Sequence, residues 1–71
     1  MKAIQREDME DEMIPVKNEE TGDESYMELR TPVRSEQHED WEDRAFYNTR
    51  LFLEDGTVVL AMSVDLDFIN D

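Results

Sequence analysis

The sequence has no cysteine, two glycines, two prolines, one tryptophan and one histidine among its 71 residues. Without cysteine, the chain forms neither a disulfide nor a thiolate metal site. Gly22 and Gly56 lie far apart, which excludes a glycine-rich phosphate loop. No apolar run approaches the roughly 18–20 residues of a membrane span, and the first residues contain no signal-peptide core, so we expect a cytoplasmic protein.

Basic residues are also scarce. Seven lysines and arginines stand against 20 acids, which gives a net charge of −13 and a pI near 4.2. Ordinary nucleic-acid binding needs Lys and Arg to neutralise phosphates, so direct binding to nucleic acid is not expected. The composition favours a protein partner that presents a basic surface. Most of the acids lie in residues 1–44, and residues 45–71 are richer in apolar side chains.

The sequence offers little material for catalysis or metal binding. Its one imidazole, His38, lies among acids in a stretch that we expect to be a surface helix. A nucleophile with a base and an orienting carboxylate is therefore not evident. The acidic stretches at 19–23 and 65–67 do not match the spacing of a calcium loop. We expect a protein that is not an enzyme and uses no cofactor or metal.

The strongest local signal is a β-hairpin centred on Glu54-Asp55-Gly56-Thr57. Asp-Gly between two apolar runs predicts a two-residue type I′ turn. That turn pairs Leu53 with Val58 and Leu51 with Leu60. Alternation along each strand then places one apolar set on the buried face, namely Tyr47, Thr49, Leu51, Leu53, Val58, Leu60, Met62 and Val64.

The remainder of the chain predicts two more strands and a helix. Residues 13–17 form a short strand whose Pro15 favours an edge position. Residues 24–33 form the next strand, and Ser35 caps a helix over 36–44 that Trp41 anchors. The expected fold class is α+β, a small antiparallel sheet of about four strands with one short helix. Residues 1–12 form an acidic flexible segment or weak helix, and residues 13–71 form the single domain.

The arrangement of the acids suggests a function. Residues i and i+2 of a strand point the same way, roughly 6.6 Å apart, so Asp65 and Asp67 form a pair, and Glu24 and Glu28 flank Tyr26. Such rows of carboxylates imitate a row of backbone phosphates. The net charge of −13 exceeds the magnitude of roughly 2–8 that solubility requires. We therefore expect an acidic DNA mimic that inhibits a DNA-processing enzyme.

The segment Asp23-Glu24-Ser25-Tyr26-Met27-Glu28-Leu29 resembles the uracil-DNA glycosylase inhibitors of bacteriophages. The resemblance implies that Glu24 and Ser25, at the start of an edge strand, dock against the DNA-binding loops of the enzyme. It implies a second acidic contact at Glu28. It also implies a pocket for an inserted leucine, lined by Met27, Leu29, Leu60 and Met62. Residues 64–68, apolar and then acidic, resemble the end of some family members.

The resemblance covers about a tenth of the chain, and the family usually has a longer helix before the Glu-Ser strand than residues 1–13 supply. Nucleases, restriction complexes and CRISPR effectors are alternative targets with similar grooves. A small structural or assembly protein that self-associates through its sheet is an alternative of another class. We expect a monomer or weak homodimer. The predicted partner-binding residues are Glu24, Ser25, Tyr26, Met27, Glu28, Leu29, Leu60, Met62, Asp65 and Asp67.

Overall fold

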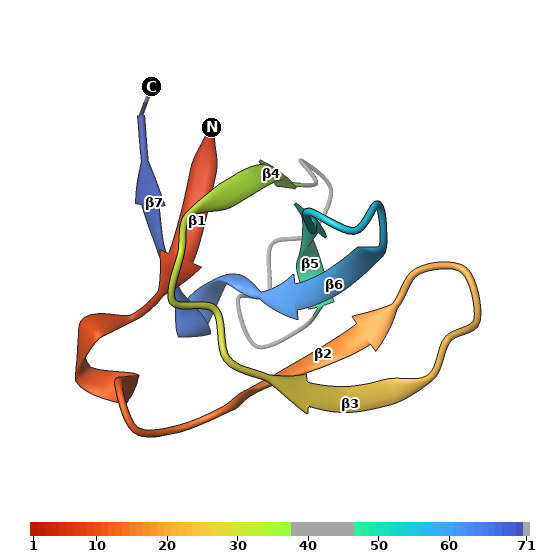
Figure 1. The fold of residues 1–71 in the computed structure, drawn as a ribbon, viewed down its shortest axis with the longest axis horizontal. Coiled ribbons are helices and arrows are strands. Elements are labelled where there is room, and N and C mark those ends of the chain that lie inside the picture. The colour runs from red at the N-terminus through yellow and green to blue at the C-terminus, as the bar shows by residue number, and fades with distance from the viewer. Residues whose placement is uncertain (38–46, 71) are drawn as a thin grey trace.

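The structure is a computed structural model that describes residues 1–37 and 47–70. The described residues form seven strands, all antiparallel, and two short 3-10 turns (Figure 1). The strands are β1 Lys2–Gln5, β2 Ile14–Asn18, β3 Glu24–Met27, β4 Val33–Gln37, β5 Tyr47–Phe52, β6 Val58–Met62 and β7 Leu66–Ile69. The turns are η1 Glu7–Met9 and η2 Ser63–Asp65.

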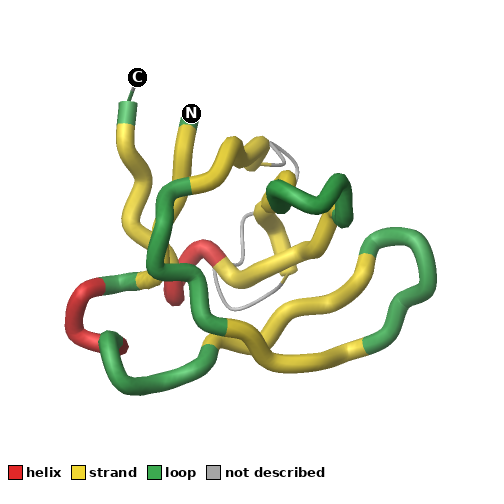
Figure 2. The backbone as a smooth tube through the Cα atoms, viewed as in Figure 1, coloured by secondary structure: helices red, strands yellow, loops and turns green. Residues whose placement is uncertain are grey.

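The strands belong to one sheet with the order β3-β2-β6-β5-β4-β1-β7. β3 and β7 are its two edges among the described strands. Figure 2 shows that the sheet curves strongly and that loops, not helices, join most of the strands. Residues 28–32 cross from β3 at one end of the sheet to β4 near the other.

The core lies on the concave side of this curve. Six of the seven strands and the crossing segment contribute to it, because short strands alternate one buried with one exposed residue. Its buried apolar members are Ala3, Ile14, Val16, Leu29, Val33, Leu51, Val59, Ala61 and Leu66.

The predicted fold class, a four-stranded α+β sheet with a helix, is wrong. The described chain is mostly β and contains 3-10 turns as its only helical elements. Ser35, expected to cap a helix, is buried inside β4 and its backbone N–H donates to the Met1 carbonyl at 2.8 Å. Glu36 continues the same strand. The rest of the expected helix, including Trp41 and His38, lies outside the described residues.

Residues 1–12 contain a strand that the expectation of a flexible segment or weak helix did not anticipate. β1 lies between β4 and β7. Ala3 and Gln5 face the core and are buried, whereas Lys2 is exposed. The period of two was hard to recognise because Gln5, a polar residue, occupies one of the two buried positions.

The predicted β5–β6 hairpin is confirmed, but its register is wrong by one residue. Leu51 lies opposite Val59, not Leu60, and Phe52 lies opposite Val58. The Leu53 N–H donates to the Thr57 carbonyl and the Gly56 N–H donates to the Leu53 carbonyl. Three residues therefore form the loop.

Backbone conformation explains this choice of turn. A type I′ turn needs φ > 0 at two consecutive residues, whereas a three-residue loop needs it at one. Gly56 has φ +90°, and no described residue other than glycine has a positive φ. The Asp55 carboxylate accepts a hydrogen bond from the Thr57 N–H at 2.9 Å and so stabilises the three-residue form. Leu51 is buried as expected, but on β6 the buried residues are Val59 and Ala61, not Leu60 and Met62.

β2 is an inner strand, not the predicted edge, because it pairs with both β3 and β6. The Glu19 N–H donates toward β6, to the Val58 carbonyl, so N–H groups at odd positions of β2 face β6. The pairing with β6 covers residues 16–18 and therefore stops one residue short of Pro15. The missing N–H of Pro15 thus falls just outside the ladder, which allows proline in an inner strand.

A bulge in β5 places two consecutive residues, Asn48 and Thr49, inside the protein. The Asn48 amide nitrogen donates to the Ser63 hydroxyl at 3.0 Å, and the Asn48 amide oxygen accepts from the Ser63 N–H at 3.0 Å. The Thr49 hydroxyl donates to the same oxygen at 3.0 Å. This buried polar cluster joins β5 to η2, so β6 ends at Met62. Val64, expected on the buried face of the same strand, lies exposed in η2.

Candidate protein-binding surface

β3 carries four of the predicted binding residues, and alternation divides them between two faces. Glu24 lies opposite Lys17 and Tyr26 opposite Pro15, on the convex face of the sheet. Tyr26 is 68% exposed. The predicted strand 24–33 ends at Met27, so this face is shorter than expected.

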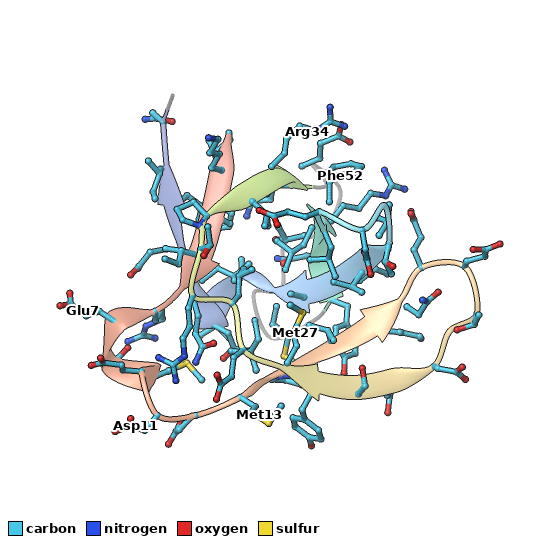
Figure 3. All side chains as sticks on the ribbon, in the orientation of Figure 1. Glu7, Asp11, Met13, Met27, Arg34 and Phe52 are labelled. Carbon is cyan, nitrogen blue, oxygen red and sulfur yellow. The ribbon has the colours of Figure 1, made fainter. Side chains whose placement is uncertain are left out.

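Ser25 and Met27 point to the concave face. Ser25 lies opposite Val16 and Met27 opposite Ile14, and both of these partners are buried. Ser25 is nevertheless exposed because β3 is an edge strand. Met27 packs against the core, and Figure 3 shows its side chain directed from β3 toward the body of the molecule.

A row of apolar and aromatic side chains runs across the convex face. Tyr26 lies opposite Pro15 in β2, and Tyr47 lies opposite Met62 in β6. The β2–β6 register, continued by one residue, brings Pro15 beside Met62. Tyr47, Met62 and Pro15 are half-buried, so the row is a partly accessible surface.

Two carboxylates, those of Glu24 and Asp65, lie near the Tyr47 end of this row. Burial raises the pKa of the Tyr47 hydroxyl, and the nearby Glu24, Tyr26 and Asp65 raise it further. The structure therefore brings together Glu24, Tyr26, Met62 and Asp65 from the predicted set. Tyr47 was not predicted as a site residue, because its position next to the bulge is not evident from the sequence.

Leu60 precedes Met62 by two residues in β6 and so lies on the same convex face. Its neighbours are Lys17 in β2 and Arg50 in β5. Arg50 forms ion pairs with Glu19 and Glu36. The next row ends in Arg34, whose guanidinium lies 4.1 Å from the ring centre of Phe52 (Figure 3). The convex face therefore has basic residues in its middle, and its acids lie around them.

Asp65 and Asp67 do not form the expected pair along one strand. Asp65 belongs to η2 and Asp67 to β7. Burial raises the pKa of Asp65, and the charge of Arg6 opposes this effect. The Arg6 N–H donates to the Asp65 carbonyl at 3.0 Å, and the Arg6 guanidinium donates to the Val64 carbonyl at 3.1 Å. Arg6 thus holds η2 in place.

The predicted leucine pocket is not formed by its four residues. Leu29 is 4% exposed and belongs to the core on the concave side. Leu60 and Met62 are half-buried on the convex side. The sheet itself separates the two pairs, because the β6 residues that face the core are Val59 and Ala61. The register error in the hairpin is the cause of this wrong prediction.

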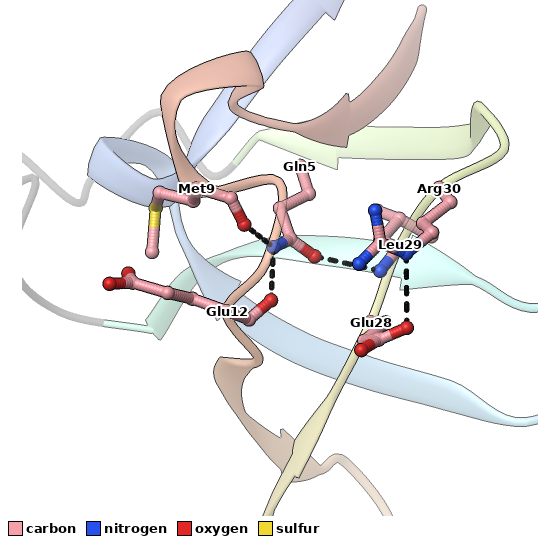
Figure 4. Close-up of polar contacts among 6 residues, drawn as sticks. All are labelled: Gln5, Met9, Glu12, Glu28, Leu29 and Arg30. Carbon is pink, nitrogen blue, oxygen red and sulfur yellow. Dashed lines mark hydrogen bonds and ion pairs between the residues drawn. The ribbon is translucent and has the colours of Figure 1, made fainter.

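Gln5 connects β1, the crossing segment and the acidic turn after β1 (Figure 4). Its N–H donates to the Leu29 carbonyl at 3.0 Å, and its side-chain oxygen accepts from the Leu29 N–H at 2.9 Å. Its side-chain nitrogen donates to the carbonyls of Met9 and Glu12. Gln5 is 7% exposed, so these bonds are sheltered from water. No pattern in the sequence indicates this role.

The acidic turn, residues 6–12, is therefore ordered by hydrogen bonds. The Met9 N–H donates to the Arg6 carbonyl at 3.0 Å and the Glu12 N–H to the Met9 carbonyl at 2.9 Å. In Figure 3, Glu7 and Asp11 point outward from this turn. Its exposed acids are Glu7, Asp8, Glu10, Asp11 and Glu12.

Glu28 and Arg30 flank Leu29 and form an ion pair at 3.0 Å. The hydrogen bond from Arg30 and its positive charge lower the pKa of Glu28. The hydrogen bond to Glu28 raises the pKa of Arg30, and the negative charges of Glu10 and Asp11 add a smaller increase. The acidic turn therefore lies beside this pair. Glu28 is thus partnered within the chain, whereas Glu24 forms no ion pair with another described residue. A groove of about 370 Å³ lies here, lined by Ile4, Gln5, Arg6, Glu7, Glu10, Leu29, Arg30 and Asp67.

Within residues 1–37 and 47–70, no group of three or more His, Cys, Asp or Glu side chains has the geometry to hold a metal ion. None of the helical turns in this part of the chain is long and apolar enough to span a membrane. No protein-family model matches the sequence, and neither a curated protein nor a solved structure is significantly similar to it.

Proposed function

We propose that this protein is an acidic DNA mimic that inhibits a DNA-processing enzyme by occupying its basic DNA-binding groove. The observation that carries the proposal is the number of carboxylates held exposed on a small folded sheet. Among the described residues, ion pairs engage only the carboxylates of Asp8, Glu19, Glu28 and Glu36. The other described acids form no ion pair with a described basic residue.

The net charge is of the same order as that of a DNA duplex of similar length. The longest dimension of the molecule is 27 Å. Duplex DNA carries one negative charge per about 1.7 Å, so this length of duplex carries about 16 charges. The net charge of the chain is −13. A groove that neutralises DNA phosphates would therefore meet a comparable total charge.

Order in the acidic turn also supports mimicry. A flexible acidic tail loses conformational entropy when a partner fixes it, whereas a preorganised array loses less. Gln5 fixes the turn from inside the protein through its bonds to Met9, Glu12 and Leu29. Hydrogen bonds also order the turn at 19–23, because the Asn18 side-chain oxygen accepts from the N–H groups of Glu20 and Thr21.

Uracil-DNA glycosylase is the first target to test. The resemblance implies an edge strand that begins with Glu-Ser, and Glu24 and Ser25 begin β3, which is exposed at a sheet edge. The implied leucine pocket has no counterpart among Met27, Leu29, Leu60 and Met62. Nucleases, restriction complexes and CRISPR effectors are therefore the next targets. A non-catalytic inhibitor encoded by a bacteriophage, active in the bacterial cytoplasm, fits this proposal.

The test is a uracil-excision assay with increasing amounts of the protein. We expect inhibition near one-to-one stoichiometry, competition with DNA, and weaker inhibition at higher salt. Glu24→Gln with Ser25→Ala should raise the inhibition constant at least about tenfold, since truncating a charged contact at an interface costs about 2–5 kcal/mol. Glu54→Gln, at an exposed site in the hairpin loop, is the matched control. Absence of inhibition would exclude this target and direct the assay to a nuclease.

Self-association is the second candidate function, favoured by the two open edges. Among the described strands, β3 and β7 each have a neighbour on one side only. An assembly protein should associate more strongly at high salt, because salt screens the repulsion between its acids. A sedimentation series over protein and salt concentration distinguishes this behaviour from that of a monomeric DNA mimic.

A further inference from the structure

The main chain of β3 has hydrogen-bonding groups that its neighbour β2 does not use. In an antiparallel pair, the N–H and C=O groups of a residue point to the same side, and the side alternates along the strand. The Asn18 N–H donates to the Asp23 carbonyl at 2.8 Å, so Asp23 faces β2. By alternation Ser25 and Met27 also face β2. The main-chain groups of Glu24 and Tyr26 therefore point away from it.

Pro15 agrees with this assignment. It lies opposite Tyr26, and a residue without an N–H fits a pair that exchanges no hydrogen bonds. No described strand lies on the outer side of β3. Glu24, Ser25 and Tyr26 are all exposed. Within residues 1–37 and 47–70, nothing pairs with the outer edge of β3, whose donors and acceptors are thus an accessible template for an added strand.

Charge determines which strand this edge can accept. Glu24 and Glu28 lie on either side of Tyr26, and Asp23 precedes them, all exposed. Residues directly opposite in an antiparallel pair have Cβ atoms about 4.5–5.5 Å apart, where opposite charges attract and like charges repel. A second copy, with its own net charge of −13, would place acids near acids. β7, the other edge, has one acid, Asp67, and so offers a weaker charge match.

We propose that the outer edge of β3 accepts an extended, basic segment of the partner protein as an additional antiparallel strand. Main-chain bonds to Glu24 and Tyr26 supply the affinity. Lysine or arginine side chains beside Asp23 and Glu24 supply most of the selectivity, because Arg30 already partly neutralises Glu28, and the same acids disfavour pairing between two copies. The inference rests on the proposed function for its basic partner, but it concerns the main chain of the edge rather than the charge of the whole surface.

The test uses the intact protein and two capped peptides. In the first peptide, arginine alternates with threonine and valine. In the second, glutamate replaces each arginine. Amide hydrogen exchange is measured by NMR. The arginine peptide should slow exchange at Glu24 and Tyr26 about tenfold when its concentration is near ten times the dissociation constant. Ser25 and Met27, already bonded to β2, should change less. The glutamate peptide should have no effect.

Two variants of one residue separate the main chain from the side chain. Tyr26→Pro removes an outward N–H without removing a bond to β2, and should weaken binding of the arginine peptide about tenfold. Tyr26→Thr keeps the N–H and should weaken binding less than about threefold. Glu24→Lys with Glu28→Lys should exchange the preference, so that the glutamate peptide binds instead. This last variant tests the edge even if the proline variant fails to fold.

Three results would overturn the inference. The first is no protection of Glu24 and Tyr26 at millimolar arginine peptide. The second is equal protection by both peptides. The third is protection that rises with protein concentration alone, which would show that a second copy occupies the edge. Because no enzyme enters this assay, its failure beside salt-sensitive inhibition of an enzyme would leave the proposed function standing.

Discussion

Gln5 shows how one polar residue can organise an acidic surface. It occupies a position in β1 where the strand pattern calls for an apolar side chain, and it uses its amide to bond Leu29, Met9 and Glu12. A buried amide is tolerated because all its polar atoms find partners. The exposed acids of the turn therefore depend on a residue that no partner would contact.

Gln5→Met, which keeps a similar volume, should lower the free energy of unfolding by about 1–3 kcal/mol, since the buried Leu29 N–H loses its acceptor. Urea denaturation measures the change. Gln37→Met, at an exposed position of β4, is the matched control and should stay within about 0.5 kcal/mol of the unaltered protein. Equal effects of the two substitutions would contradict the role assigned to Gln5.

The same reasoning applies to the buried cluster of Asn48, Thr49 and Ser63. Ser63→Ala should destabilise the protein by about 1–3 kcal/mol, because the Asn48 amide nitrogen loses its acceptor. Ser25→Ala, at the exposed edge, serves as the control for the loss of a hydroxyl. A thermal or urea transition unchanged in Ser63→Ala would mean that Asn48 finds another acceptor.

Tyr47 tests whether the convex face is assembled as described. The absorbance difference between the unaltered protein and Tyr47→Phe should titrate above the usual tyrosine value of about 10. Because the folded pKa is raised, the stability that Tyr47 contributes is present below the unfolded pKa and is lost as the pH rises through the folded pKa.

Removing one of the charges near Tyr47 provides the control for this titration. Glu24→Gln should bring the Tyr47 pKa closer to its usual value, although burial, the larger cause, remains. Glu54→Gln, in the hairpin loop, should leave the midpoint unchanged. A midpoint that responds equally to both substitutions would indicate that Glu24 does not lie near Tyr47.

At the level of elements, the sequence predicted segments with a clear period of two and failed where one residue changes the register. The hairpin was predictable because apolar residues flank Asp55 and Gly56. Its register was not, because Asp-Gly suits both a two-residue and a three-residue loop, and each leaves a plausible apolar face on β6. Placing Leu60 and Met62 in the predicted pocket followed directly from that choice.

The other errors have similar local causes. Ser35 fits a helix cap by sequence and a buried strand position by structure, and the backbone bond to Met1 comes from a distant segment that sequence patterns do not reveal. Pro15 predicts an edge strand, yet its missing N–H falls beyond the end of the β2–β6 ladder. Of the predicted site, Glu24, Tyr26, Met62 and Asp65 do lie near one another. Alternation within β3 accounts for Glu24 and Tyr26. Met62 and Asp65 join them because of the shifted β5–β6 register and the turn η2, which the sequence pattern does not reveal.

Gly56 gives a direct test of the three-residue loop. Gly56→Ala should destabilise the protein by about 1 kcal/mol, since alanine rarely adopts a positive φ. The cost is conformational, because nothing lies within 4 Å of an added Cβ. Gly56→Asn should cost less, as asparagine tolerates this region better. Urea denaturation measures the stability of both variants. Equal losses of stability would argue against a left-handed residue at this position.

For the whole molecule, a net charge of −13 acts on a chain with a small core. Repulsion among exposed acids opposes the folded state and is screened as salt rises.

If the acids serve a partner rather than the fold, salt should have opposite effects on two measurements. The urea midpoint of the free protein should rise between low and high sodium chloride, while affinity for the inhibited enzyme should fall. Ion pairs such as Arg50 with Glu19 are half-exposed and contribute little to the first effect. A complex that tightens with salt, or a free protein that loses stability, would mean that the carboxylates stabilise this sheet and do not imitate DNA.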